Sequence, residues 1–134
     1  MKPLILVVDD EAYIREMLTM LLELQGFAVV EAVDGRDALE KIPDIEPDVI
    51  ILDVMMPRMD GITLCQILRR DPETAHLPII MLSGKTHLNA KQDGLAAGAD
   101  YYLFKPMKTA ELLANIHTVL ALTAVPVSAS AAYI

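Results

Sequence analysis

Four short apolar runs in this chain each end in a side chain that carries a carboxylate, a hydroxyl or an ammonium group, the types used in phosphoryl chemistry. In chain order, these residues are Asp9 with Asp10, Asp53, Ser83 and Lys105. Ligands of an open parallel α/β sheet bind outside the carboxyl ends of its strands, so residues far apart in the sequence can meet in one crevice. The pattern therefore predicts one pocket that combines three carboxylates, a hydroxyl and an ammonium group.

The apolar runs themselves predict buried β-strands, because they are rich in Val and Ile and lack polar interruptions. The expected strands are 4–8, 28–30, 49–52, 79–82 and 101–104. Between them the apolar spacing is helical, most clearly from Ile14 to Leu22, before Gly26 ends the helix. The other expected helices are 36–42 before Pro43, one that opens after Asp60 and reaches 70, 88–97, and one around 112–120.

Strand and helix alternate five times, which predicts right-handed crossovers and a three-layer, doubly wound α/β domain. Of the two common strand orders, five strands fit the flavodoxin-like (βα)5 order 2-1-3-4-5, whose switch point lies between the first and third strands. This order brings Asp9 and Asp10 next to Asp53.

Length and composition predict a single soluble domain, since 134 residues contain 54% hydrophobic and 22% charged residues. The net charge of -8 argues against direct contact with nucleic acid or with an anionic membrane, because both need clustered Lys and Arg. No apolar stretch reaches the roughly 18 residues that span a bilayer, and the N-terminus does not resemble a signal peptide. We therefore expect a cytoplasmic protein.

Three clustered carboxylates are electrostatically costly, because like charges at close range raise one another's pKa. A hard divalent cation relieves this cost, and Mg²⁺ fits best, since it binds through one or two carboxylates and completes its octahedron with water and phosphate oxygens. The histidines His76, His87 and His117 stand apart without partners at ligand spacing, so zinc is not expected.

Four motifs at the ends of the predicted strands carry a resemblance to a known family. They are Val7–Glu11 (VVDDE), Leu52–Gly61 (LDVMMPRMDG), Ile80–Gly84 (IMLSG) and Gly98–Pro106 (GADYYLFKP). In this order, they resemble the receiver domain of bacterial two-component response regulators, of the chemotaxis-regulator type. The resemblance covers the chain from about residue 4 to 122.

The resemblance implies that Asp53 accepts a phosphoryl group from a phosphohistidine on a sensor histidine kinase or a phosphotransfer protein. Asp10, Asp53 and the backbone carbonyl of Met55 would hold Mg²⁺, and Asp9 would act directly or through water. The chain would then be a signalling domain rather than a metabolic enzyme, although it would catalyse its own phosphorylation and dephosphorylation at Asp53.

The resemblance also implies a switch. Ser83 and Lys105 would contact the phosphoryl oxygens, and the movement of Ser83 would admit the Tyr102 ring and change the face formed by the fourth helix, fifth strand and fifth helix. The bond between Lys105 and Pro106 resembles the cis peptide of the family. Met55 and Lys85 flank the route of an attacking water, so we expect both to influence the phosphoryl lifetime.

Two other classes of protein compete with this interpretation. A Mg²⁺-dependent phosphatase of the haloacid dehalogenase type needs a second Asp two positions after the first, where this chain has Met55. A flavodoxin or dinucleotide-binding module needs a glycine-rich phosphate loop after the first strand, where this chain has Asp9-Asp10-Glu11. Within the family, a degenerate receiver that acts without phosphorylation as an interaction module stays open.

The domain boundary is expected near residue 122. Residues 1–122 would form the receiver, and 123–134, rich in Ala, Val and Ser, would form a flexible tail or the start of a linker. The output would pass to a separate effector protein or to an output domain outside this sequence. The loop at 71–78 resembles the longer loop of stand-alone, relay and cyclase-linked receivers. Dimerisation on phosphorylation is a further hypothesis, which size-exclusion chromatography with a phosphoryl mimic would test.

Overall fold

The computed structural model describes residues 2–84 and 89–132, with side chains described as far as 122. Within these residues, strands and helices alternate five times, as predicted. The strands are β1 (Leu4–Val8), β2 (Ala28–Ala32), β3 (Val49–Asp53), β4 (Ile79–Ser83) and β5 (Tyr101–Phe104). The helices are α1 (Ala12–Leu24), α2 (Gly35–Ile45), α3 (Gly61–Arg70), α4 (Ala90–Ala97) and α5 (Thr109–Ala132).

The strands form one parallel sheet in the order β2-β1-β3-β4-β5, which confirms the predicted flavodoxin-like topology. The register aligns the carboxyl ends of neighbouring strands, because Val8 pairs with Leu52, Asp53 with Leu82, and Ser83 with Phe104. The predicted chemical residues therefore meet at one edge of the sheet.

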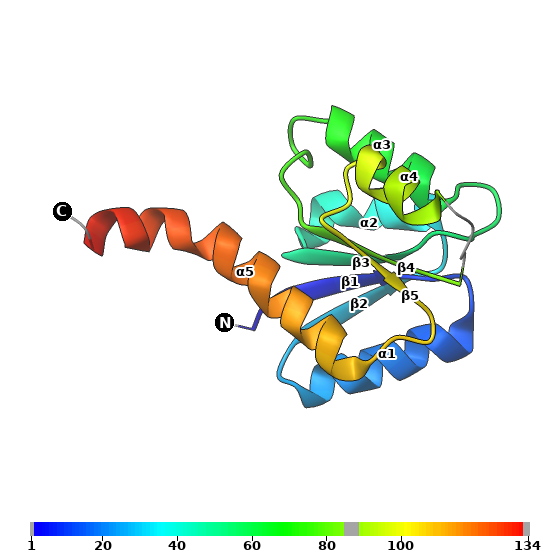
Figure 1. Ribbon diagram of the computed structural model, residues 1–134, viewed down its shortest axis with the longest axis horizontal. Coiled ribbons are helices and arrows are strands. Elements are labelled where there is room, and N and C mark those ends of the chain that lie inside the picture. The colour runs from blue at the N-terminus through cyan, green and yellow to red at the C-terminus, as the bar shows by residue number, and fades with distance from the viewer. Residues whose placement is uncertain (1, 85–88, 133–134) are drawn as a thin grey trace.

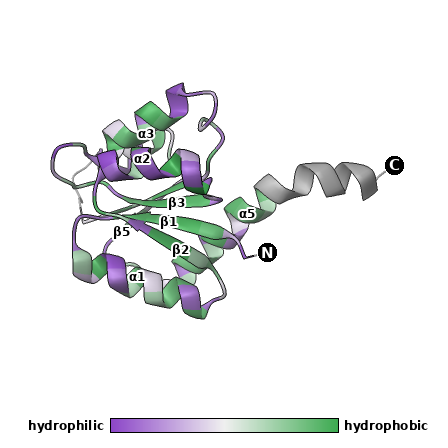
Figure 2. Ribbon diagram, turned by 180° about the vertical axis from the view of Figure 1, so that it is seen from behind, coloured by the Kyte–Doolittle hydropathy of each residue, from purple (hydrophilic) through white to green (hydrophobic). Residues whose placement is uncertain are grey.

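Helices cover both faces of the sheet and form three layers (Figure 1). Helices α2, α3 and α4 lie on one face, and α1 and the first part of α5 lie on the other. Each face has its own buried core, and β3 and β4 are buried at every position, which explains why their sequences do not alternate. The strands are apolar along most of their length, and the helices carry polar residues on their outer sides (Figure 2).

Two helices differ from the sequence expectation. Helix α2 does not stop at Pro43 but continues to Ile45. Pro43 removes one backbone N–H donor from the helix, but Ile42 and Ile45 both pack on the core, and this packing outweighs the lost hydrogen bond. Helix α5 continues past residue 122 to Ala132, where we expected a flexible tail, and the Ala content of this segment favours a helix. The domain boundary at 122 stays a prediction.

The beginning of α3 is packed tightly against the end of β3. The Asp60 side chain caps the helix by accepting the Thr63 N–H at 2.8 Å, and the Gly61 N–H donates to the Val54 carbonyl at 2.9 Å. A Cβ atom on Gly61 would lie 2.5 Å from the Asp53 carbonyl oxygen and 2.8 Å from Val54 Cα. Only glycine allows the helix to begin so close to Asp53.

Among the described helices, none combines the length and the apolar character of a membrane span.

We expect Gly61→Ala to lower the free energy of unfolding by about 1–3 kcal/mol, because the added methyl group overlaps backbone atoms that cannot move freely. Urea unfolding would measure this change. The matched control is Gly84→Ala, since a Cβ atom at Gly84 meets nothing within 4 Å. Equal effects of the two variants would contradict the packing argument.

Candidate functional site

Three carboxylates gather at the carboxyl ends of β1 and β3. Asp9, Asp10 and Asp53 each place one carboxylate oxygen within 4.8 Å of the others. Asp9 and Asp53 are only 2% and 4% exposed, whereas Asp10 is exposed. The predicted acidic cluster is therefore confirmed, and it opens to solvent on the Asp10 side.

Lys105 supplies the positive charge of the pocket. Its Nζ atom lies 3.2 Å from Asp9 Oδ2 and 3.5 Å from Asp53 Oδ1, so the ammonium bridges both buried carboxylates. Lys105 thus contacts Asp53, and Asp9 is its nearer partner. The Lys105 N–H donates to the Ser83 carbonyl at 2.8 Å, and the bond between Lys105 and Pro106 is cis, as predicted.

The electrostatics of the pocket favour an added cation. Burial, and then the charge of Asp9, raise the pKa of Asp53 from 3.8 to about 6, although Lys105 and the Met55 N–H act in the opposite direction. Burial by itself would lower the pKa of Lys105, but the charges of Asp53 and Asp9 raise it. Among the described residues, the buried carboxylates thus outweigh the Lys105 ammonium.

The donor set fits a hard divalent cation. Carboxylate oxygens are the ligands that Mg²⁺ prefers, and Asp10 remains exposed on the open side of the cluster. A pocket of ≈ 440 Å³ adjoins this side and is lined by Asp10, Val54, Met55, Met56, Pro57 and Asp60. The Met55 N–H donates to Asp53 Oδ1 at 3.3 Å, which holds the loop after β3 against the cluster.

Ser83 and Tyr102 lie deeper in the fold. Ser83 is fully buried at the end of β4, and Tyr102 on β5 is 4% exposed. The Tyr102 hydroxyl is buried and has no hydrogen-bond partner among the described residues. A Cβ atom on Gly94 of α4 would lie 2.8 Å from Tyr102 Cε2, so the ring occupies space that glycine leaves free. The Tyr102 ring therefore already points inward in this structure. Lys85, which we expected to influence the phosphoryl lifetime, lies outside the described residues.

Arg15 belongs to the surroundings of this site, and the sequence interpretation missed it. Its guanidinium donates to the Asp9 carbonyl at 2.7 Å and to Glu31 Oε1 at 3.0 Å. The available signal was its position, because Arg15 shares the buried face of α1 with Leu18 and Leu22. A charged residue on an apolar face needs a partner.

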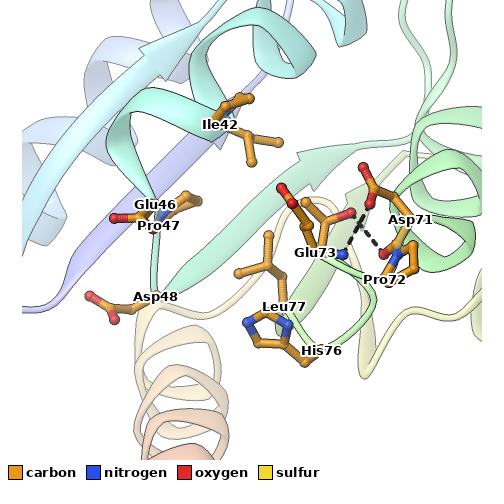
Figure 3. Close-up of a pocket in the computed structure, with 11 residues that line it drawn as sticks. Ile42, Glu46, Pro47, Asp48, Asp71, Pro72, Glu73, His76 and Leu77 are labelled. Carbon is orange, nitrogen blue, oxygen red and sulfur yellow. Dashed lines mark hydrogen bonds between the residues drawn. The ribbon is translucent and has the colours of Figure 1, made fainter.

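A second pocket lies at the opposite edge of the sheet. It has a volume of ≈ 640 Å³ and lies between the α2–β3 turn and the α3–β4 loop, at the amino ends of β3 and β4 (Figure 3). Asp71 there accepts the Glu73 N–H at 3.0 Å, a contact within the loop. This pocket is therefore remote from the acidic cluster, which lies at the carboxyl ends of the strands.

A doubly wound domain with an acidic cluster and one lysine at its switch point defines the class of receiver-type signalling domains, and comparison with known proteins agrees. The family model for the response regulator receiver domain matches residues 5–117. The chain therefore belongs to the receiver domain family, which acts in two-component, phosphoryl-accepting signal transduction, a signalling and not a metabolic role. Members of this family generally use Mg²⁺.

Relatives and solved structures support this assignment. The chain is 41% identical over 118 residues to the DNA-binding dual master transcriptional regulator RpaA of Synechocystis, covering 88% of this chain and 49% of RpaA. It is 46% identical over 116 residues to the phosphate regulon transcriptional regulatory protein PhoB of Pseudomonas aeruginosa, covering 87% and 51%. The chain thus spans about half the length of the curated relatives it matches.

Among solved structures, a putative response regulator from Chloroflexus aurantiacus is 40% identical with a TM-score of 0.86, covering 90% of this chain and 99% of that chain. The chemotaxis protein CheY4 of Vibrio cholerae is 38% identical with a TM-score of 0.83, covering 90% and 100%. Both likenesses extend over nearly the whole of those chains, so the fold and the family agree.

The raised pKa of Asp53 predicts a dependence of stability on pH. The folded protein holds the Asp53 proton up to about pH 6, whereas the unfolded chain releases it near 3.8, so this group stabilises the fold most below pH 4 and loses its effect as the pH rises to 6. At 1.36 kcal/mol per pKa unit, the difference is about 3 kcal/mol.

We therefore expect Asp53→Asn to raise the free energy of unfolding at pH 7, without Mg²⁺, by up to about 3 kcal/mol, and to raise it little at pH 4. Urea unfolding at both pH values would measure this. The control is Asp44→Asn, because Asp44 is exposed and lies in α2. A gain at pH 7 no larger than that of the control would refute the raised pKa.

The contact between Gly94 and Tyr102 predicts that Gly94→Ala expels the ring. The methyl group would overlap the ring and would also approach Met81 Sδ at 3.0 Å, so the ring must turn toward solvent. The nuclear Overhauser contacts between the Tyr102 ring and α4 should be lost. The control Ala96→Gly, also in α4, should keep them. Retained contacts in Gly94→Ala would contradict this prediction.

Proposed function

We propose that this chain accepts a phosphoryl group from the phosphohistidine of a sensor histidine kinase or phosphotransfer protein onto Asp53. The main support for this proposal is the position of Asp53, a buried carboxylate that contacts the Lys105 ammonium within the acidic cluster. An Asp53 oxygen attacks phosphorus, the phosphorus–nitrogen bond to histidine breaks, and an acyl phosphate forms. Water later attacks the acyl phosphate and releases inorganic phosphate.

Mg²⁺ would be held by Asp10, Asp53 and the backbone carbonyl of Met55, with Asp9 as a direct or water-mediated ligand. When bound, Mg²⁺ neutralises charge on the carboxylates and on the transferred group. Asp53 must be ionised to attack, and with a pKa of about 6 it is mostly ionised at neutral pH. The exposed side of Asp10 leaves room for the phosphoryl donor to approach.

Lys105 and Ser83 are proposed to contact the phosphoryl oxygens after transfer. Lys105 already lies between Asp9 and Asp53, so it can follow the charge from a carboxylate to a phosphoryl oxygen with little movement. Its backbone contact with the Ser83 carbonyl ties both residues together. Any shift of Ser83 toward the phosphoryl group would therefore be passed to β5.

Tyr102 is proposed to report this shift to the outer face of α4, β5 and α5. The ring lies beside Met81 and α4, and its centroid is 5.3 Å from that of Phe104, which is exposed. A buried hydroxyl without a partner costs about 1–3 kcal/mol, so the inward position is not strongly preferred over an outward one. Partner binding to this face can then bias the ring, and phosphorylation can bias the binding.

The output would come from a separate effector protein or from an attached output domain. Two relatives have names that describe transcriptional regulators, and each is about twice as long as the matched region. We propose a cytoplasmic location for the receiver, with the output carried by protein contacts rather than by direct nucleic-acid binding, given the net charge of -8.

We expect acetyl phosphate with Mg²⁺ to add one phosphoryl group to the chain, measured as intact mass. Asp53→Asn should abolish the gain, because it removes the nucleophilic oxygen pair, and omission of Mg²⁺ should reduce it strongly. Asp44→Asn should behave as the native chain. A native chain that gains no mass under any divalent cation would reject the phosphoacceptor function and leave a receiver that acts only by binding.

A further inference from the structure

We propose that Arg15, oriented by Glu31, is a positioning residue that fixes the turn carrying Asp9 and Asp10 and thereby sets the affinity of the acidic cluster for Mg²⁺. This inference rests on the proposed function, because it assigns a role toward the metal at the same site. It concerns a residue on α1 and a residue on β2, neither of which belongs to the acidic cluster itself.

Arg15 joins three segments around the site. From the first turns of α1 it reaches back to the Asp9 carbonyl at 2.7 Å, and its Nε donates to Glu31 Oε1 at 3.0 Å. The Arg15 side chain is only 14% exposed. Glu31 lies on β2, where it pairs with Val7 of β1, and its own carbonyl accepts a hydrogen bond from Lys41 at 2.7 Å. The guanidinium is therefore held in one orientation.

The four polar groups of Asp9 each have a separate partner. Its N–H donates to the Ala32 carbonyl, its Oδ1 accepts the Glu11 N–H, and its Oδ2 accepts from Lys105. Its backbone carbonyl accepts from Arg15. The first three contacts fix the strand end and the Asp9 side chain, and only the Arg15 contact fixes the carbonyl that leads into the next residue.

That carbonyl decides where Asp10 points. The peptide unit between Asp9 and Asp10 is planar, so holding the Asp9 oxygen also fixes the position of the Asp10 nitrogen and Cα. Among the described residues, no hydrogen bond restrains the Asp10 carboxylate, which is exposed. Its direction therefore depends on the backbone on both sides of Asp10. Arg15 holds the preceding Asp9 carbonyl, and Asp9 Oδ1 holds the following Glu11 N–H.

The contribution of Arg15 is positional and not a matter of net charge. Its charge is paired with Glu31, and its hydrogen bond goes to a neutral carbonyl rather than to the carboxylates of the cluster. Lysine cannot reproduce the two simultaneous contacts, because a guanidinium offers donors in a fixed fork and an ammonium is a point charge. Arg15→Lys should therefore recover only part of the function.

The test is a titration of the whole chain with MgCl₂ at constant ionic strength, followed by the amide NMR shifts of the residues around the cluster. The variants are Arg15→Met, Arg15→Lys and Glu31→Gln. The control is Arg70→Met, which removes the same charge at the exposed end of α3. Thermal unfolding of each variant without Mg²⁺ separates loss of fold from loss of the site.

We expect Arg15→Met to weaken Mg²⁺ binding about tenfold, as for other residues that orient metal ligands, with Arg15→Lys and Glu31→Gln in between and Arg70→Met within about twofold of the native chain. The hydrogen-exchange rate of the Asp10 amide should rise in the same order. If Arg15→Met does not fold, the order of Arg15→Lys, Glu31→Gln and Arg70→Met decides the matter.

Three results would overturn the inference. If the native chain binds Mg²⁺ and the Arg15 and Glu31 variants bind it as tightly as Arg70→Met, the positioning role is wrong and the proposed function stands. If the Arg15 variants lose thermal stability but keep the native Mg²⁺ affinity, the residue is structural only. A native chain that does not bind Mg²⁺ would reject both this inference and the metal-dependent function.

Discussion

The repulsion among three carboxylates that the fold holds within 4.8 Å is the interaction on which the rest of this structure depends. Two of them are buried, where water screens them poorly, so the pKa of Asp53 rises to about 6 even though Lys105 lies beside it. The repulsion among these carboxylates is a cost that a bound divalent cation would relieve. A site built in this way is unstable without its ligands and is therefore sensitive to them.

The fold tolerates this cluster because several independent contacts fix the backbone around it. Both faces of the central strands are covered by apolar cores, and the turns after β1 and β3 are held by hydrogen bonds. Gly61 brings α3 against the Asp53 carbonyl, and Arg15 brings α1 against the Asp9 carbonyl. Two helices thereby hold the turns that carry the acidic cluster, and the stability of the cores offsets the cost of the charges.

A short series of contacts connects the pocket to the outer surface. Lys105 contacts the buried carboxylates with its side chain and the Ser83 carbonyl with its N–H, and three residues before it the Tyr102 ring fills the space beside Gly94. These contacts join the pocket to β4 and β5. The exposed ring of Phe104, in contact with Tyr102, lies at their solvent side.

The sequence by itself determined the five alternating elements and the polar residues of the acidic cluster, because strand periodicity and the positions of polar residues after apolar runs are local properties. The strand order followed from the choice between the two common orders of doubly wound sheets, which the structure confirms. The resemblance of its motifs to the receiver family also predicted the cis bond before Pro106. Sequence reasoning ended α2 too early at Pro43, because a helix end depends on packing partners such as Ile45, which the local pattern does not contain. It also missed the continuation of α5 past residue 122, although the Ala content of that segment favours a helix. Only the tertiary structure decided that Lys105 lies nearer to Asp9 than to Asp53, that Gly94 makes room for the Tyr102 ring, and that Arg15 holds the Asp9 carbonyl. Each of these is a contact between segments that the chain brings together only after folding, so its distance and orientation are set by the packing of whole elements and not by neighbouring residues.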